Sequence, residues 1–197
     1  MGPSCIVLFE AKLTDGWSES ICKDLASLGP LTDNGTGGLD LDVRDATLVG
    51  GDDQPTAGPV LVAIESPPSE YDEQALTAFE GAVGFRPRTS LFLGMGCNTA
   101  DDHRLLGQIG LYFGEKYSGI IDFCGALLPR RLPRRFSFET TPWDAISGRF
   151  RAMIADLPGE VWEFPYVAAS GKRWVSHAGD PVFLRAWLAT PDFHMVK

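Results

Sequence analysis

The chain has 197 residues, 44% of them hydrophobic and 22% charged, which is enough apolar material for one globular domain with a sizeable core. Acidic residues outnumber basic residues by 26 to 17, giving a net charge of -9. This charge disfavours a nucleic-acid partner, and no apolar run approaches the length of a membrane span. We therefore expect a single cytoplasmic domain over residues 1–197, without nucleic acid or membrane as a partner.

The hydrophobic pattern predicts strands and helices in alternation. Trp17, Ile21, Leu25 and Leu28 recur at helical spacing, whereas residues 39–49 alternate apolar and polar positions as a half-exposed strand does. Asp180 followed by Pro181 is typical of a helix start. The predicted elements, in chain order, are strand 5–10, helix 15–28, strand 39–49, strand 59–65, helix 66–84, strand 90–95, helix 99–119, strand 120–123, helix 143–157, a hairpin over 160–178 turning at Ser170-Gly171, and helix 181–190.

This order predicts an α+β fold, a mixed α/β sandwich in which one central sheet has flanking helices and ends in a C-terminal hairpin and helix. Residues 31–58 are rich in loop-forming residues and should contain little further structure. Gly107, Gly110 and Gly114 form a stripe of small residues on one predicted helix, which favours close packing against a neighbour.

One stretch, Met95 to Leu127, carries residues that could do chemistry. Gly94 and Gly96 follow a strand as in a dinucleotide-binding loop, but the third glycine of that motif is missing. Cys97 could act as a nucleophile with His103 as its base, although no third group completes the set. We favour a well-capped helix here and keep a small enzyme or ligand-binding domain using Cys97 and His103 at the Gly94-Gly96 turn as the alternative.

Three other features have a structural explanation that we prefer to a catalytic one. The histidines lack metal-site spacing, so we expect no metal and no cofactor. Asp122 lies within an apolar run and should be held by a donor, with Arg104, Tyr166 or His177 as the candidates. The basic segment at residues 129–135 is expected to pair with the acidic half of the chain or to form an exposed loop.

Several sequence segments resemble immunity-type proteins of bacterial polymorphic toxin systems and related actinobacterial proteins of unknown function. The resemblance covers about residues 84–197. It rests on "GFRP", "DHRLLG", "SGIIDFCGAL" and "LPGEVWEFPY", and above all on the C-terminal "HAGDPVFLRAWLATPDFHMVK". The resemblance implies a non-enzyme that binds and blocks a cognate toxin, often a nuclease, by direct contact. It also implies structural roles for Asn98, Asp102, His103, Asp122, Tyr166, His177, Asp180 and Trp187.

The charge distribution agrees with such a partner. Residues 1–98 contain 15 acidic and 5 basic residues, whereas residues 99–197 contain 11 and 12. An acidic surface suits the basic cleft of a nuclease, because complementary fields speed association. We expect a monomer or weak homodimer that binds a basic toxin through the acidic residues Asp40, Asp42, Asp45, Asp52, Asp53, Asp72 and Glu73.

Overall fold

The computed structural model describes residues 2–51, 58–127, 143–167, 173–191 and 193–196. Within these ranges the chain forms one eight-stranded sheet with five α-helices and a short 3₁₀ helix. The strands are β1 Ser4–Phe9, β2 Leu31–Asp33, β3 Leu39–Leu41, β4 Val60–Glu65, β5 Thr89–Met95, β6 Ile120–Asp122, β7 Val161–Val167 and β8 Arg173–Gly179. The helices are α1 Asp15–Leu28, η1 Thr47–Val49, α2 Glu73–Val83, α3 Ala100–Lys116, α4 Trp143–Ile154 and α5 Pro181–Leu188.

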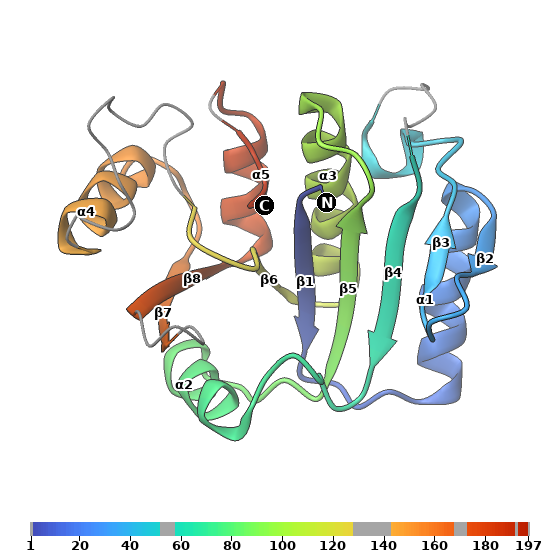
Figure 1. Ribbon diagram of the computed structural model, residues 1–197, viewed down its shortest axis with the longest axis horizontal. Helices are drawn as coiled ribbons and strands as arrows, with labels where there is room; N and C mark the ends of the chain where they lie inside the picture. The colour runs from blue at the N-terminus through green and yellow to red at the C-terminus, as the bar shows by residue number, and fades with distance from the viewer. Residues whose placement is uncertain (1, 52–57, 128–142, 168–172, 192, 197) are drawn as a thin grey trace.

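The sheet runs in the order β2-β3-β4-β5-β1-β6-β8-β7, and every pair of neighbours is antiparallel. The predicted α+β class with one central sheet is therefore confirmed (Figure 1). The β7–β8 hairpin and the last helix are also present as expected, while the predicted turn at Ser170-Gly171 and the basic segment 129–135 lie outside the described residues.

The larger hydrophobic core lies between the sheet and the helices α1, α3, α4 and α5. Val7 and Phe9 of β1 face this core, whereas Ile6 and Leu8 face the opposite side, as alternation along a strand requires. Phe150 of α4 and Trp187 of α5 are fully buried in the same core. This layer holds most of the apolar surface that folding removes from water and fixes the plane of the sheet.

The glycine stripe of α3 does allow close packing. A Cβ atom at Gly107 would lie 2.7 Å from the ring of Phe193, and one at Gly114 would lie 2.9 Å from the end of Ile121. Gly110 faces Cys5, with 3.4 Å to its sulfur. Larger residues on this face would push α3 away from the sheet and from the C-terminal segment.

The N-terminus of α3 is closed by a capping box. The Thr99 side chain accepts a hydrogen bond from the Asp102 backbone N–H, and Asp102 Oδ2 accepts from the Thr99 backbone N–H at 2.6 Å. Each bond satisfies a backbone donor that the helix itself leaves unpaired. The predicted capped helix is confirmed, and Asp102 points at Thr99 instead of at a ligand shared with His103.

We predict that Thr99→Ala lowers the free energy of unfolding by about 1 kcal/mol, because it removes the hydroxyl of this cap. Thr99→Ser keeps that hydroxyl and is the matched control, expected to stay within about 0.5 kcal/mol of the native protein. Urea denaturation followed by circular dichroism measures both. Equal stability of the two variants would show that the cap contributes nothing.

Two sequence expectations about element bounds were wrong. Strand 39–49 shrinks to β3 because the chain after Leu41 bonds to the end of α1, with Arg44 N–H donating to Leu28 O at 2.9 Å. The helix predicted from residue 66 starts only at Glu73, where Asp72 accepts from the Ala75 N–H. In addition, β2 forms within the segment expected to be loop.

Candidate partner-binding face

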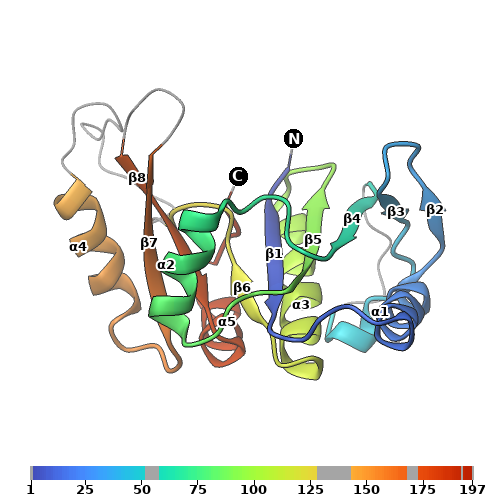
Figure 2. The same cartoon turned by 90° about the horizontal axis from the view of Figure 1, so that it is seen from below.

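The second face of the sheet is only partly covered. Among the described helices, α2 alone lies on this side, where it contacts β7, and Phe79 packs near Ile6, Leu8 and Ala178. Figure 1 looks onto this face and shows β5, β4 and β3 in front of α3 and α1, with no described helix before them. On β1, Ile6 and Leu8 are buried in the cluster beside α2, so β1 borders this area. Figure 2 shows α2 and the β2–β3 end of the sheet on opposite sides of β1, β5 and β4. We call this area the open face, and its central side chains are Leu61, Ala63 and Phe92.

Strand register sets the composition of the open face. One row across the sheet runs through Asp40, Leu61, Gly94 and Ser4 on β3, β4, β5 and β1. The next row runs through Ala63, Phe92, Ile6 and Asp122, and a third begins with Glu65 and Ser90. The open face therefore has an apolar centre of Leu61, Ala63 and Phe92, which are half-buried, with acidic residues beside it.

Gly94 lets the Phe92 ring lie along the sheet. A Cβ atom at Gly94 would be 3.0 Å from two ring carbons of Phe92 and 3.9 Å from Leu61 Cβ. The ring thus covers the glycine and extends the apolar centre toward Leu61. This packing gives Gly94 a role in shaping a surface, whereas the sequence had suggested a nucleotide-binding turn as the alternative.

The acidic residues of the open face cluster at its ends. Glu65 Oε2 accepts from the Ser69 N–H at 2.9 Å, which holds the segment before α2. Desolvation raises the pKa of Glu70, and the nearby Glu65 carboxylate raises it further. At the other end, Asp40 Oδ1 has no hydrogen-bond donor among the described residues. A cationic partner would relieve the repulsion between Glu65 and Glu70.

Asp122 marks the border between the open face and the part under α2. Its carboxylate accepts from Tyr71 Oη at 2.5 Å, from the Cys124 N–H at 2.7 Å and from Ser176 Oγ at 3.0 Å. Burial raises the pKa of Asp122, while these three bonds oppose the rise. The Tyr71 pKa is raised by burial and by the Asp122 charge. The cluster ties the segment leading into α2 to β6 and β8.

Two of the three expected partners of Asp122 were wrong. Arg104 donates instead to the Leu188 carbonyl at 3.2 Å, and His177 Nδ1 accepts from the Leu127 N–H at 2.9 Å. The side chain of Tyr166 lies outside the described residues. The true partner, Tyr71, is 51 residues away in sequence, and no spacing pattern could have identified it.

The seven acidic residues expected to bind a partner do not lie together. Asp40 belongs to the open face, while Asp42 pairs with Arg44 and Asp45 accepts from Thr47 in the loop after β3. Asp72 and Glu73 start α2, on the other side of the open face, and Glu73 pairs with Arg86. Asp52 and Asp53 lie outside the described residues. The structure thus places Asp40 at one end of the open face and Asp72 and Glu73 at the other, and the sequence prediction did not include Glu65 and Glu70.

The residues given structural roles by the resemblance mostly join distant segments. His103 is close to Asn98 Oδ1, at 3.1 Å, and its Nδ1 accepts from the Met195 N–H at 3.0 Å. Asp180 caps α5, and the buried Trp187 donates its ring N–H to the His194 carbonyl. These bonds fasten the C-terminal segment to α3 and α5.

The same geometry bears on the enzyme alternative. The two ring nitrogens of His103 contact Asn98 and Met195, and no hydrogen bond between Cys97 and His103 occurs among the described residues. The Cys97 sulfur lies instead near Gly58, 3.2 Å from where a Cβ of that glycine would be. Within the described part of the chain, no cluster of three or more metal-binding side chains is present, and no helix is long and apolar enough to cross a bilayer.

A second buried polar group lies on the opposite side of the sheet. His177 is fully buried, and its ring contacts that of Phe150 in a tilted arrangement with centroids 4.0 Å apart. Its Nε2 lies 3.6 Å from Glu163 Oε1, and Glu163 is held by Ser147 and Arg151. Burial lowers the pKa of His177 to about 4, although the Glu163 charge opposes the shift. His177 is therefore neutral in the folded protein. Its Nδ1 accepts the Leu127 N–H and so holds the segment that follows β6.

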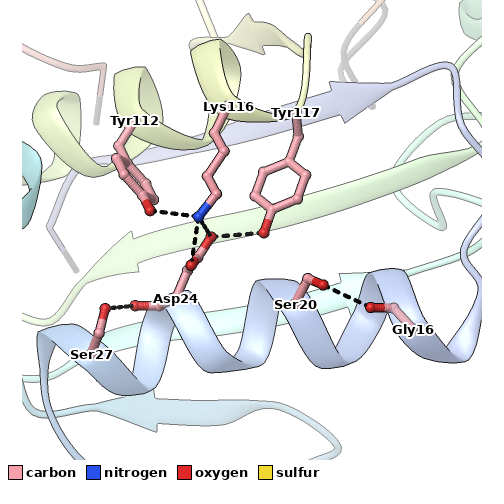
Figure 3. A network of polar contacts seen from close by, with 7 residues as sticks. All are labelled: Gly16, Ser20, Asp24, Ser27, Tyr112, Lys116 and Tyr117. Carbon is pink, nitrogen blue, oxygen red and sulfur yellow. Dashed lines mark hydrogen bonds and ion pairs between the residues drawn. The ribbon is translucent and has the colours of Figure 1, made fainter.

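A third polar group joins α1 to α3 (Figure 3). Lys116 Nζ donates to Asp24 at 2.7 Å and to Tyr112 Oη at 3.0 Å, and Tyr117 Oη donates to Asp24 at 2.7 Å. Burial raises the pKa of Asp24, but the bonds from Lys116 and Tyr117 outweigh it and leave the pKa lowered. Each of these polar side chains has a hydrogen-bond partner within the network, so we interpret the network as a structural link between α1 and α3.

Comparison with known proteins gives one match. No curated protein and no solved structure matches the chain. The model of a family of unknown function, DUF6368, matches residues 1–197. The match extends over the first 83 residues as well as the C-terminal motifs, and the chain therefore belongs to the DUF6368 family.

Proposed function

We propose that this protein is a cytoplasmic immunity-type inhibitor, which binds a basic bacterial toxin by direct contact and blocks it without chemistry. The observation that carries the proposal is the open face, where half-buried Leu61, Ala63 and Phe92 lie between acidic residues at both ends. An apolar centre with a charged rim is the usual composition of a protein interface.

The charge of the chain supports the same partner. A toxin that acts on nucleic acid presents lysine and arginine to phosphate, and a protein of net charge -9 attracts such a surface over a distance of about 8 to 10 Å at physiological salt. Asp40, Glu65 and Glu70 would steer the toxin toward the open face, and burial of the apolar centre would then hold it. The charges thus set the rate of association more than the lifetime of the complex.

The proposal is tested by affinity capture from the native cells, with the native protein and two variants as bait. The first variant combines Asp40→Lys, Glu65→Lys and Glu70→Lys, and the control variant carries Asp156→Lys, an exposed acid away from the open face. We expect a basic protein to be captured by the native and control baits and to be lost or much reduced on the triple variant. Capture of an acidic protein, or equal capture by all three baits, would contradict the proposal.

Association kinetics give a second measurement with the captured partner after its purification. The triple variant should bind at least about tenfold more slowly than the native protein at low salt, because it reverses three charges that attract the partner. The difference should shrink as salt rises. Unchanged association rates at low salt would remove these three acids from the interface.

A further inference from the structure

One end of the sheet carries a second interaction surface, independent of the open face. The sheet order ends at β7, so one edge of this strand has no neighbouring strand among the described residues. Unpaired N–H and C=O groups on an exposed edge attract another strand, and edge strands are therefore a common site of pairing between chains.

The register determines which backbone groups point outward. In β8, the His177 N–H donates to Gly125 O and the His177 carbonyl accepts from the Phe123 N–H, so His177 faces β6 and not β7. Its register partner on β7 is Glu163, whose backbone groups must then point away from β8, and the same holds for Val161 opposite Gly179. The bond from Asp180 N–H to Glu160 O agrees with this alternation.

The outward edge is short and symmetric. Pro165 is the next residue with this orientation, and it has no N–H to donate. Val161 and Glu163 are therefore the consecutive outward positions before Pro165 that offer both a donor and an acceptor, and they flank Trp162. A two-fold axis through Trp162 would place Val161 of one copy opposite Glu163 of the other. Each such pair exchanges two hydrogen bonds, giving four in all.

Side chains around the axis suit a second copy. Trp162 is half-buried and would face its own copy in the non-hydrogen-bonded position, where cross-strand side chains come closest and aromatic pairs are most favourable. The copies of Glu163 would be diagonal neighbours, but each is already paired with Arg151 at 2.8 Å, which offsets their repulsion.

A hollow lies beside this edge, between α2 and α4. A cavity of about 390 Å³ lies there, open to solvent and lined by Ala82 of α2, by Phe150, Arg151 and Ile154 of α4, and by Val161, Trp162 and Glu163 of β7. Figure 2 shows β7 between α4 and α2. Phe79 of α2 stacks on Phe164, and Phe150 of α4 contacts the His177 ring, so both helices are anchored on the sheet beside this edge.

We propose that this protein forms a homodimer by antiparallel pairing of β7 with β7 of a second copy around Trp162, giving one continuous sheet. Trp162 on the two-fold axis, with an outward donor and acceptor on each side of it, favours a second copy as the partner strand. The contact is short, since Pro165 ends it, and its dissociation constant should be on the order of 10 to 100 µM. The dimer leaves the open face exposed, so it does not depend on the proposed function.

Sedimentation velocity of the full chain from about 1 to about 500 µM tests the proposal. We expect the native protein to pass from monomer to dimer in this range. Val161→Pro removes one outward N–H without touching the bonds to β8, and Trp162→Lys places two like charges on the axis. Each variant should weaken the dimer at least tenfold, whereas the control Val161→Thr, which keeps the N–H, should dimerise as the native protein does.

Thermal unfolding of each variant at low concentration shows that the monomer still folds. If one variant is unfolded, the other carries the test. A native protein that stays monomeric throughout the range, or a dimer that both folded variants leave unchanged, would overturn the proposal.

Discussion

Replacing Leu61 and Phe92 by arginine is expected to weaken binding of the proposed basic partner by at least 100-fold, about 3 kcal/mol. Both side chains belong to the apolar centre of the open face, and burial of aromatic and aliphatic side chains at the middle of an interface supplies most of its affinity. The two new positive charges would also repel a basic surface. Isothermal titration calorimetry with the purified partner measures the change.

A matched control separates this effect from charge alone. Leu48 and Val182 are the exposed large hydrophobic residues of the described chain, with 45% and 53% exposure, and they lie on η1 and α5, on the helical side of the sheet. The double variant Leu48→Arg and Val182→Arg makes the same change in net charge. Equal losses of affinity in the two double variants would place the contact somewhere other than the open face.

The second large effect concerns stability at acidic pH. The pKa of His177 falls from 6.5 to about 4 on folding because the ring is buried. As pH decreases, the unfolded chain therefore takes up the proton before the folded chain does, and this lowers the free energy of unfolding. The contribution of His177 is complete above pH 6.5, is lost progressively between pH 6.5 and 4, and amounts to about 3 kcal/mol.

Chemical denaturation at several pH values, for the native protein and for His177→Gln, measures this contribution. Glutamine does not titrate, and its carbonyl can accept the hydrogen bond from the Leu127 N–H that His177 accepts. Glu163 and Arg151, which face the ring, remain in both proteins, as does Asp122. The variant should lose less stability than the native protein between pH 7 and 4, and parallel curves would show that His177 is not buried neutral.

The sequence predicted the helices whose position depends on the spacing of apolar residues and on the capping residue. The helical spacing of Trp17, Ile21, Leu25 and Leu28 gave α1, and the cap at Asp180 gave α5 with its observed start. The same reasoning failed at residues 39–49, where alternation suited a strand but the backbone of Arg44 bonds to the end of α1. The length of β3 depends on the neighbouring strand with which it pairs, and its neighbour β2 spans only Leu31–Asp33.

The candidate site was less predictable, because it depends on strand order. Asp40 was expected at the partner surface from charge alone, but Leu61, Ala63 and Phe92 read as ordinary strand residues until the register placed them on one face without a helix. Likewise, Tyr71 meets Asp122 only through the crossing of the segment before α2 over the sheet. Such contacts between distant segments leave no periodic pattern in a single sequence.

Calorimetric titration of the purified partner into the native protein at about 50 mM and about 300 mM salt tests the central claim most directly. An open face that binds a basic protein through acidic residues and an apolar centre predicts tight binding at low salt and weaker binding at high salt. It also predicts a negative heat-capacity change from apolar burial. Binding that does not change with salt, or a partner with an acidic binding surface, would contradict this account.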